Sequence, residues 1–272
     1  MPIIRDRLTV ALSTIKKDEE WGYYNTSQFL NLHTKTNFSI NKEALPKISA
    51  FMKYILNDLQ IIETIINRMA WQNDLRNNDQ LDEWKWMSFS ECDINLFNIH
   101  IRSIFDYAAK IIQRSADNPK SCDMNSFEDV KNWLLKNPEN NSKILGQELS
   151  KFVLSVDWFE GIRTLRDEVM HRGGKVIVMS DNNKLLFQVM KARYAYLILT
   201  PELMFNENLA YFESYAGLYF GYLIAFLEEL SIIIENRLPK GTHSSGLGDP
   251  KRVFGEKPII YEWIENLLIV KP

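Results

Sequence analysis

The sequence predicts an all-α protein, an antiparallel helical bundle that carries one small β-hairpin. Three observations lead to this prediction. Long stretches place apolar residues at steps of three and four, which is the helical period. Over residues 175–191 the period changes to that of extended chain. Proline, glycine and asparagine separate these stretches, so each stretch is expected to be one element.

The composition is that of an ordinary globular protein. The chain has 272 residues, of which 46% are apolar and 25% charged, enough for one long domain or two ordinary ones. A net charge of −3 argues against a protein that coats nucleic acid indiscriminately, although a local basic patch is compatible with it. Cys92 and Cys122 are too far apart for a metal-ligand pair and too few for a disulfide scaffold. They indicate two free thiols and a cytoplasmic location.

No membrane partner is expected from the apolar runs. The N-terminus lacks the long apolar run of a secretory signal. The most apolar stretch, 215–227, is followed at once by two glutamates and is shorter than the about 20 apolar residues of a membrane span. A buried bundle helix explains this stretch better.

Three segments are expected along the chain. Residues 1–44 form an N-terminal segment that is irregular apart from a short helix over 6–15. Residues 45–238 form the bundle. Residues 239–272 form a tail rich in glycine, proline and serine, which ends in a short helix over 259–270. That helix is expected to dock on the bundle or on a second subunit.

The bundle opens with two long helices. The first begins at Pro46, because proline suits the first helical position, and its pattern fades near Asn77. The second begins near Asp82, is most regular over 94–112, and is broken before Pro119. Their apolar residues alternate as in the seam of a bundle.

A polar stripe follows the second long helix. Asn98, Arg102 and Asp106 are each one helical turn apart, so Arg102 and Asp106 can form an ion pair. Two interpretations are open. The stripe is a solvated face, which the low value of exposed ion pairs favours, or it is a polar wall that faces the helix carrying Arg166 and His171.

Shorter helices connect the long ones. Ser126 can cap a helix over 127–135, which the run Asn-Pro-Glu-Asn-Asn-Ser ends. A further helical piece over 146–156 leads into the central helix. Four tryptophans in this half of the chain lie at helical spacings and are expected to pack in the core rather than to stack on bases. They are Trp84, Trp86, Trp133 and Trp158.

The hairpin over 175–191 has arms of about five residues and a four-residue loop, Ser-Asp-Asn-Asn. A lone hairpin is marginally stable, so it must lean on the bundle. The last long helix is expected from Asn206 to Arg237, before Pro239. Its expected buried face consists of Leu209, Phe212, Ala216, Phe220, Leu223, Phe226, Leu230 and Ile234.

The central helix, expected over 158–174, carries the candidate site. It ends at Gly173, where a glycine suits the left-handed C-cap. Arg163, Asp167 and His171 lie away from its apolar face, each one turn from the next. Asp167 is within reach of His171 and can fix its tautomer. The negative end of the helix dipole favours the protonated imidazole.

The string from Arg166 to His171, Arg-Asp-Glu-Val-Met-His, is an arginine, a polar residue and a histidine five positions after the arginine, at a capped helix end. It resembles the signature of the HEPN superfamily of nucleotide-binding helical bundles. The resemblance covers about residues 45–238, and the hairpin directly after the motif resembles a family branch with a hairpin insertion. It implies an all-α bundle that commonly dimerises with the motif at the interface.

The resemblance implies a metal-independent endoribonuclease of the toxin or defence type, with RNA or a nucleotide as ligand and an antitoxin protein as a partner. A 2′-hydroxyl must lose its proton to attack the phosphate, and the departing 5′-oxygen needs one. His171 can do either. Arg166 would stabilise charge on the phosphorane, and Asp167 would orient His171.

Arg166 and His171 are about 140° apart around a straight helix, so one chain does not easily present both to one atom. A two-fold homodimer brings one subunit's arginine to the other's histidine. Four further residues are predicted to contact the substrate or support the site. These are Arg163, Arg172, Arg102 and Asp106.

The sequence also bears on two other functional classes. A non-catalytic nucleotide-binding, RNA-binding or protein-interaction module of the same fold is favoured by the acidic charge balance and by the lack of an obvious basic stripe. A metalloenzyme built in a helical bundle needs Glu-x-x-His pairs on two facing helices. The sequence does not supply two, so no metal and no cofactor are predicted.

Overall fold

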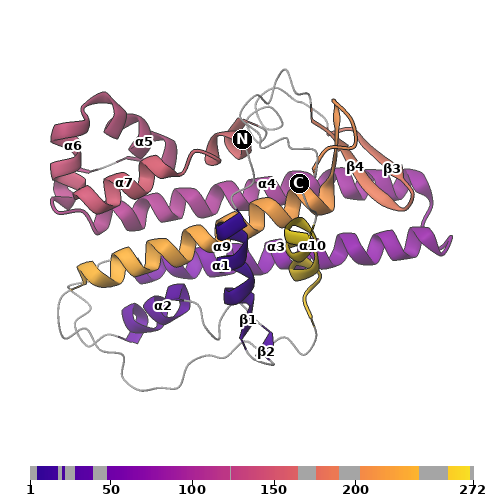
Figure 1. The fold of residues 1–272 in the computed structure, drawn as a ribbon, viewed down its shortest axis with the longest axis horizontal. Coiled ribbons are helices and arrows are strands. Elements are labelled where there is room, and N and C mark those ends of the chain that lie inside the picture. Colours follow the sequence, from indigo (N-terminus) through magenta and orange to yellow (C-terminus); the bar gives the residue numbers. More distant parts are fainter. Residues whose placement is uncertain are drawn as a thin grey trace.

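A computed structural model gives the fold. The structure describes residues 5–17, 20–21, 28–38, 48–122, 124–164, 176–189, 203–238 and 257–269. The two longest helices, α3 (Ile48–Asn77) and α4 (Glu83–Arg114), lie side by side and antiparallel, and α9 (Phe212–Arg237) runs along them (Figure 1). The expected all-α class with a small β insertion is confirmed.

The helices of the two terminal segments pack against α9. They are α1 (Arg5–Ile15), α2 (Gln28–Phe38) and α10 (Ile259–Ile269). A short antiparallel pair, β1 (Lys16–Lys17) with β2 (Glu20–Trp21), follows α1. The prediction of an irregular chain after the first helix was wrong for residues 28–38, which form α2. Its asparagines and threonines are weak helix formers, but burial of Phe29, Leu30 and Leu32 outweighs that preference.

Helix caps define the middle of the chain. Asp82 accepts a hydrogen bond from the backbone of Lys85 at the start of α4. A short 3₁₀ turn, η2 (Pro119–Ser121), follows α4. Ser126 and Asp129 form a complete capping box on α5 (Phe127–Lys136), which confirms the predicted cap.

The run Asn-Pro-Glu-Asn-Asn-Ser was expected only to end α5. It also starts α6 (Pro138–Leu145), because proline is preorganised for a first helical turn. Gly146 then separates α6 from α7 (Gln147–Ser155), which confirms the expected helix at 146–156.

The hairpin has a shorter loop than expected. β3 (Val178–Asp181) and β4 (Lys184–Gln188) pair up to Asp181 with Lys184, so the loop is only Asn182 and Asn183. Both have positive φ, 44° and 66°, as a two-residue type I′ turn requires.

A third strand, β5 (Leu209–Tyr211), pairs with β4. The expected start of the last helix at Asn206 was therefore wrong, since α9 begins at Phe212. Except for Leu209, which is only partly buried in β5, the residues of the predicted apolar face are buried.

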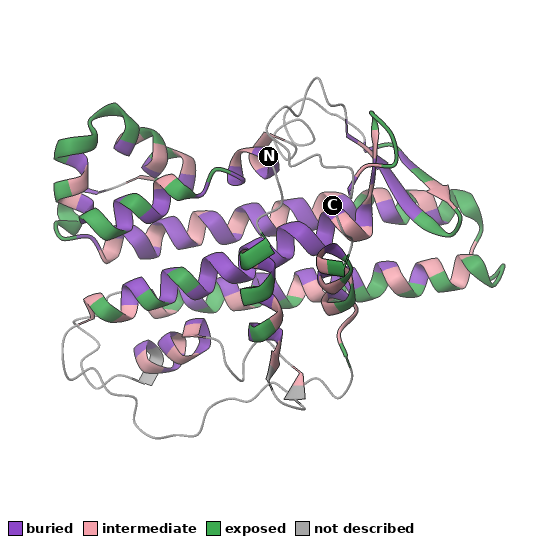
Figure 2. Ribbon diagram, viewed as in Figure 1, coloured by how far each residue is buried: buried purple, intermediate pink, exposed green. Residues whose placement is uncertain are grey.

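Helix α9 forms the centre of the core, and burial follows nearly its whole length (Figure 2). Its 26 residues are long and apolar enough to cross a membrane by length and composition. In this fold, however, 89% of its most apolar window is buried inside the protein. Neighbouring helices therefore cover the apolar surface that composition alone would assign to lipid.

The predicted packing of tryptophans in the core is confirmed for Trp86 and Trp158, which are each 1% exposed. Trp133 is only partly buried. It was wrong for Trp84, which is 78% exposed. Trp84 and Trp86 are two positions apart, about 200° around the helix, so only one of them can face the core.

Candidate functional site

The described chain enters the motif segment through one helical turn, residues 159–164. Three side chains in and directly before this turn are at most 1% exposed. They are Trp158, Phe159 and Ile162. The ring of Phe105 on α4 lies 5.2 Å from that of Trp158 and 4.7 Å from that of Phe159, centroid to centroid. Such contacts hold the turn 159–164 against α4.

The polar stripe on α4 faces the protein interior. Asn98 is 3% exposed and Arg102 is 9% exposed, so the interpretation as a solvated face was wrong for both. Tyr215 on α9 donates a hydrogen bond to Asn98 Oδ1 at 2.6 Å, and Asn98 donates through Nδ2 to the carbonyl of Ile94 at 2.8 Å. A polar group can be buried here because its hydrogen bonds are supplied.

Arg102 and Asp106 join three elements. They form the ion pair that their spacing predicts. The Arg102 guanidinium lies 4.9 Å from the ring centre of Phe159, a cation–π contact. Asp106 also accepts a hydrogen bond of 3.2 Å from the backbone of Phe127, in the first turn of α5. The stripe therefore ties α4 to α5 and to the turn 159–164.

Arg163 is engaged with two carboxylates. It lies 3.0 Å from Glu160 in its own turn and 2.9 Å from Glu128 on α5. Lys131 on α5 lies 3.5 Å from Glu160 and donates a hydrogen bond of 3.0 Å to the carbonyl of Val156. Each partly exposed pair contributes little alone, about 0–1 kcal/mol. Together they clamp the turn to α5.

The central residues of the sequence motif lie outside the described residues. Arg166, Asp167, His171 and Arg172 all fall within 165–175. Their roles stay predictions, as does the helix expected to continue to 174. Among the other predicted site residues, the structure brings Arg102 and Asp106 together and directs Arg163 toward α5.

Sequence reasoning missed the carboxylate partners of Arg163. Glu160 stands three positions before it, so this pair was visible as a one-turn spacing. Glu128 is on another helix, and no local pattern links it to Arg163. Phe159 was likewise not identified as the ring beneath Arg102.

A second arginine precedes a histidine at a similar spacing, Arg237 before His243. Arg237 has a structural role: it forms an ion pair with Asp117 and donates a hydrogen bond of 2.9 Å to the carbonyl of Ser115. It also fills the space beside Gly146, where a Cβ would come within 2.7 Å of the guanidinium. His243 lies outside the described residues.

Among the residues that the structure describes, no three or more histidine, cysteine, aspartate or glutamate side chains gather as metal ligands would. Comparison with protein families, with characterised proteins and with solved structures found no match to this chain.

Proposed function

We propose that this chain is a HEPN-like protein that cleaves RNA without a metal ion, using Arg166 and His171. One observation carries the proposal. The motif lies between the anchored turn 159–164 and the hairpin β3–β4, in an antiparallel bundle completed by the long helix α9. This is the order of elements that the resemblance implies. The clamp between the turn and α5 supplies a fixed base for the motif segment.

The proposed chemistry needs only side chains of this type. His171 takes the proton of a 2′-hydroxyl, or returns one to the departing oxygen. The 2′-oxygen bonds to phosphorus as the bond from phosphorus to the 5′-oxygen breaks, which leaves a cyclic phosphate and a 5′-hydroxyl. Arg166 stabilises the added negative charge because its guanidinium is planar and always protonated. Asp167 orients His171.

The test is cleavage of a single-stranded RNA in the presence of EDTA. Replacement H171A should reduce cleavage by about 10²–10⁴-fold, the usual contribution of a general acid or base, and R166A by a comparable factor. Both variants should keep the helicity and Tm of the parent protein. The matched control is H243A, which removes the other histidine that follows an arginine at similar spacing and should leave cleavage unchanged.

Retained cleavage in H171A would overturn the proposal, as would cleavage that disappears with EDTA. A strongly destabilised H171A would instead indicate a structural histidine. Comparison of Tm with H243A separates these outcomes.

A homodimer is part of this proposal, since Arg166 and His171 are about 140° apart around a straight helix. Light scattering at tens of micromolar should give twice the monomer mass. Mixing the inactive variants R166A and H171A should restore about a quarter of the activity, because half of the dimers are mixed and each has one intact composite site. A monomer, or a mixture without activity, would exclude the shared site.

A non-catalytic binding module is the second candidate. It is favoured by one observation: Arg102 and Arg163, both predicted to bind substrate, have their guanidinium groups engaged with carboxylates of the same chain. Binding of RNA or nucleotide without cleavage, unaffected by H171A, would favour this candidate over the nuclease.

A further inference from the structure

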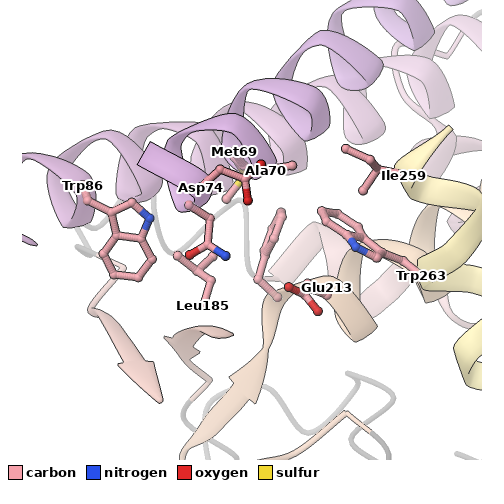
Figure 3. A pocket seen from close by; sticks show the side chains of 10 residues that line it. Met69, Ala70, Asp74, Trp86, Leu185, Glu213, Ile259 and Trp263 are labelled. Atoms are coloured by element: carbon pink, nitrogen blue, oxygen red, sulfur yellow. The ribbon is translucent and has the colours of Figure 1, made fainter. Parts of the chain in front are cut away.

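A cavity of about 230 Å³ lies at the first turn of α9, where α3, α4, α10 and β4 meet (Figure 3). None of its residues belongs to the motif. In Figure 3 the α3 residues lie along one side, with Trp86 at one end, Trp263 at the other, and Glu213 facing α3. The lining residues are Met69, Ala70, Asn73, Asp74, Trp86, Leu185, Phe212, Glu213, Ile259 and Trp263.

Three aromatic residues border the cavity, and Trp263 is the one that is only partly buried. Phe212 and Trp263 meet edge to face, with ring centres 6.2 Å apart. Trp86 and Phe212 are each 1% exposed, and the Arg76 guanidinium lies 4.4 Å from the ring centre of Trp86. Trp263 is therefore the lining ring that a ligand can reach. The faces of such rings carry negative charge density and attract cations, tryptophan most strongly.

The polar atoms at the cavity also suit a positive ligand. Asp74 and Glu213 supply carboxylates. Asn73 donates through Nδ2 to the carbonyl of Asn183 at 2.9 Å, while its buried Oδ1 accepts no hydrogen bond from the described residues. The described residues that line the cavity include no lysine, arginine or histidine. The wall therefore combines acceptors and aromatic rings, without a cationic side chain of its own.

Burial of the Glu213 carboxyl is only partly offset by a neighbouring positive charge. Burial raises its pKa above the ordinary value, and the charge of Lys184 lowers that pKa only in part. A cation bound beside Glu213 would favour its ionised form. Binding of such a ligand should therefore release protons at pH values near this pKa.

We propose that this cavity binds a small organic cation of the alkylammonium or quaternary ammonium class. The ring of Trp263, which is only partly buried, contacts its apolar body, and the carboxylates of Asp74 and Glu213 face its charge. The cavity is smaller than the about 300–1,000 Å³ of sites for drug-sized ligands. It therefore suits one small molecule rather than a peptide.

The probe is choline, compared with its uncharged isostere 3,3-dimethylbutan-1-ol, by calorimetric titration of the full chain. Both fill the same volume, so their difference reports the charge. Choline should bind with at least about tenfold higher affinity, because ring faces and a partly desolvated carboxylate both favour the cation. Tryptophan fluorescence should change with the same midpoint.

Replacement E213Q should weaken choline binding by about tenfold and leave the isostere unaffected, since glutamine keeps the shape and removes the charge. D74N should have a smaller effect because Asp74 is exposed. The matched control is E229Q, an exposed glutamate farther along α9, which should leave both affinities unchanged.

Equal affinities for choline and the isostere would overturn the proposal, as would an E213Q effect no larger than that of E229Q. W263L tests the aromatic wall independently and should also weaken choline more than the isostere. Because the site shares no residue with the motif, these outcomes and the RNA-cleavage result are independent of each other.

Discussion

Two regions along α9 use the same kinds of side chain with different results. In the middle of the helix, Phe105 reaches the rings of Phe127, Trp158, Phe159 and Phe226, with centres 4.7–5.2 Å away. The space left beside Trp158 and Phe226 is only about 20 Å³, close to the volume needed for one water molecule. At the first turn of α9, aromatic residues instead border a cavity of about 230 Å³.

The two regions differ in how closely their aromatic rings contact one another. Around Phe105, rings from α4, α5, α9 and the turn 159–164 contact one another directly. At the first turn of α9, Trp86 and Trp263 come from opposite ends of the cavity, and carboxylates stand between them (Figure 3). Close packing suits the region that anchors the motif segment, and a hollow suits a region that binds a ligand.

The largest expected effect is in the packed region. F105A removes a fully buried ring with four aromatic neighbours and should lower the free energy of unfolding by about 3–5 kcal/mol. Thermal unfolding should show a Tm lower by on the order of 10 °C. The matched variant is W263A, which removes a side chain that borders the cavity and is only partly buried. Its free energy of unfolding should fall by less than half as much. Equal losses would contradict the contrast between the regions.

Two glycines on α9 provide an intermediate effect. A Cβ on Gly217 would lie 2.9 Å from the backbone carbonyl carbon of Trp263, so G217A must displace α10 and should lower stability by about 1–3 kcal/mol. A Cβ on Gly221 would lie 2.8 Å from the end of the Leu8 side chain, which can rotate away, and in ordinary contact, 3.6 Å, with Ile264.

G221A should therefore be neutral or slightly stabilising, since alanine favours the helix by about 1 kcal/mol. Urea unfolding of both variants measures the difference. Because G217A moves α10, it should also weaken choline binding, whereas G221A should not. A G221A variant as unstable as G217A would contradict the backbone clash.

The smallest expected effect concerns pH. The pKa of Glu213 is raised by burial in the folded protein, so the native state holds this proton more tightly than the unfolded chain does. Stability is therefore lost as pH rises above the ordinary glutamate value of about 4.3. E213Q should raise Tm at pH 7 by no more than about 3 °C and leave it unchanged near pH 4. A lower Tm at pH 7 would contradict the raised pKa.

Much of the fold could be predicted because its signals are local. The C-terminal end of α3, the start of α4, the capping box of α5 and the start of α7 follow from helical period, caps and glycine. The pairing of Arg102 with Asp106 follows from one-turn spacing. Strand β5 could not be predicted, because its residues continue the helical pattern of α9 and only pairing with β4 makes them extended.

Sequence by itself determined the long helices and the hairpin, because backbone preference and apolar period are properties of neighbouring residues. It also placed Arg166 five positions before His171. It did not determine α2 or α6, whose residues are weak helix formers. Only the tertiary structure decided that Glu128 engages Arg163, and that Asp74, Glu213 and Trp263 surround one cavity. These residues are far apart in the chain, so their meeting depends on how whole helices pack.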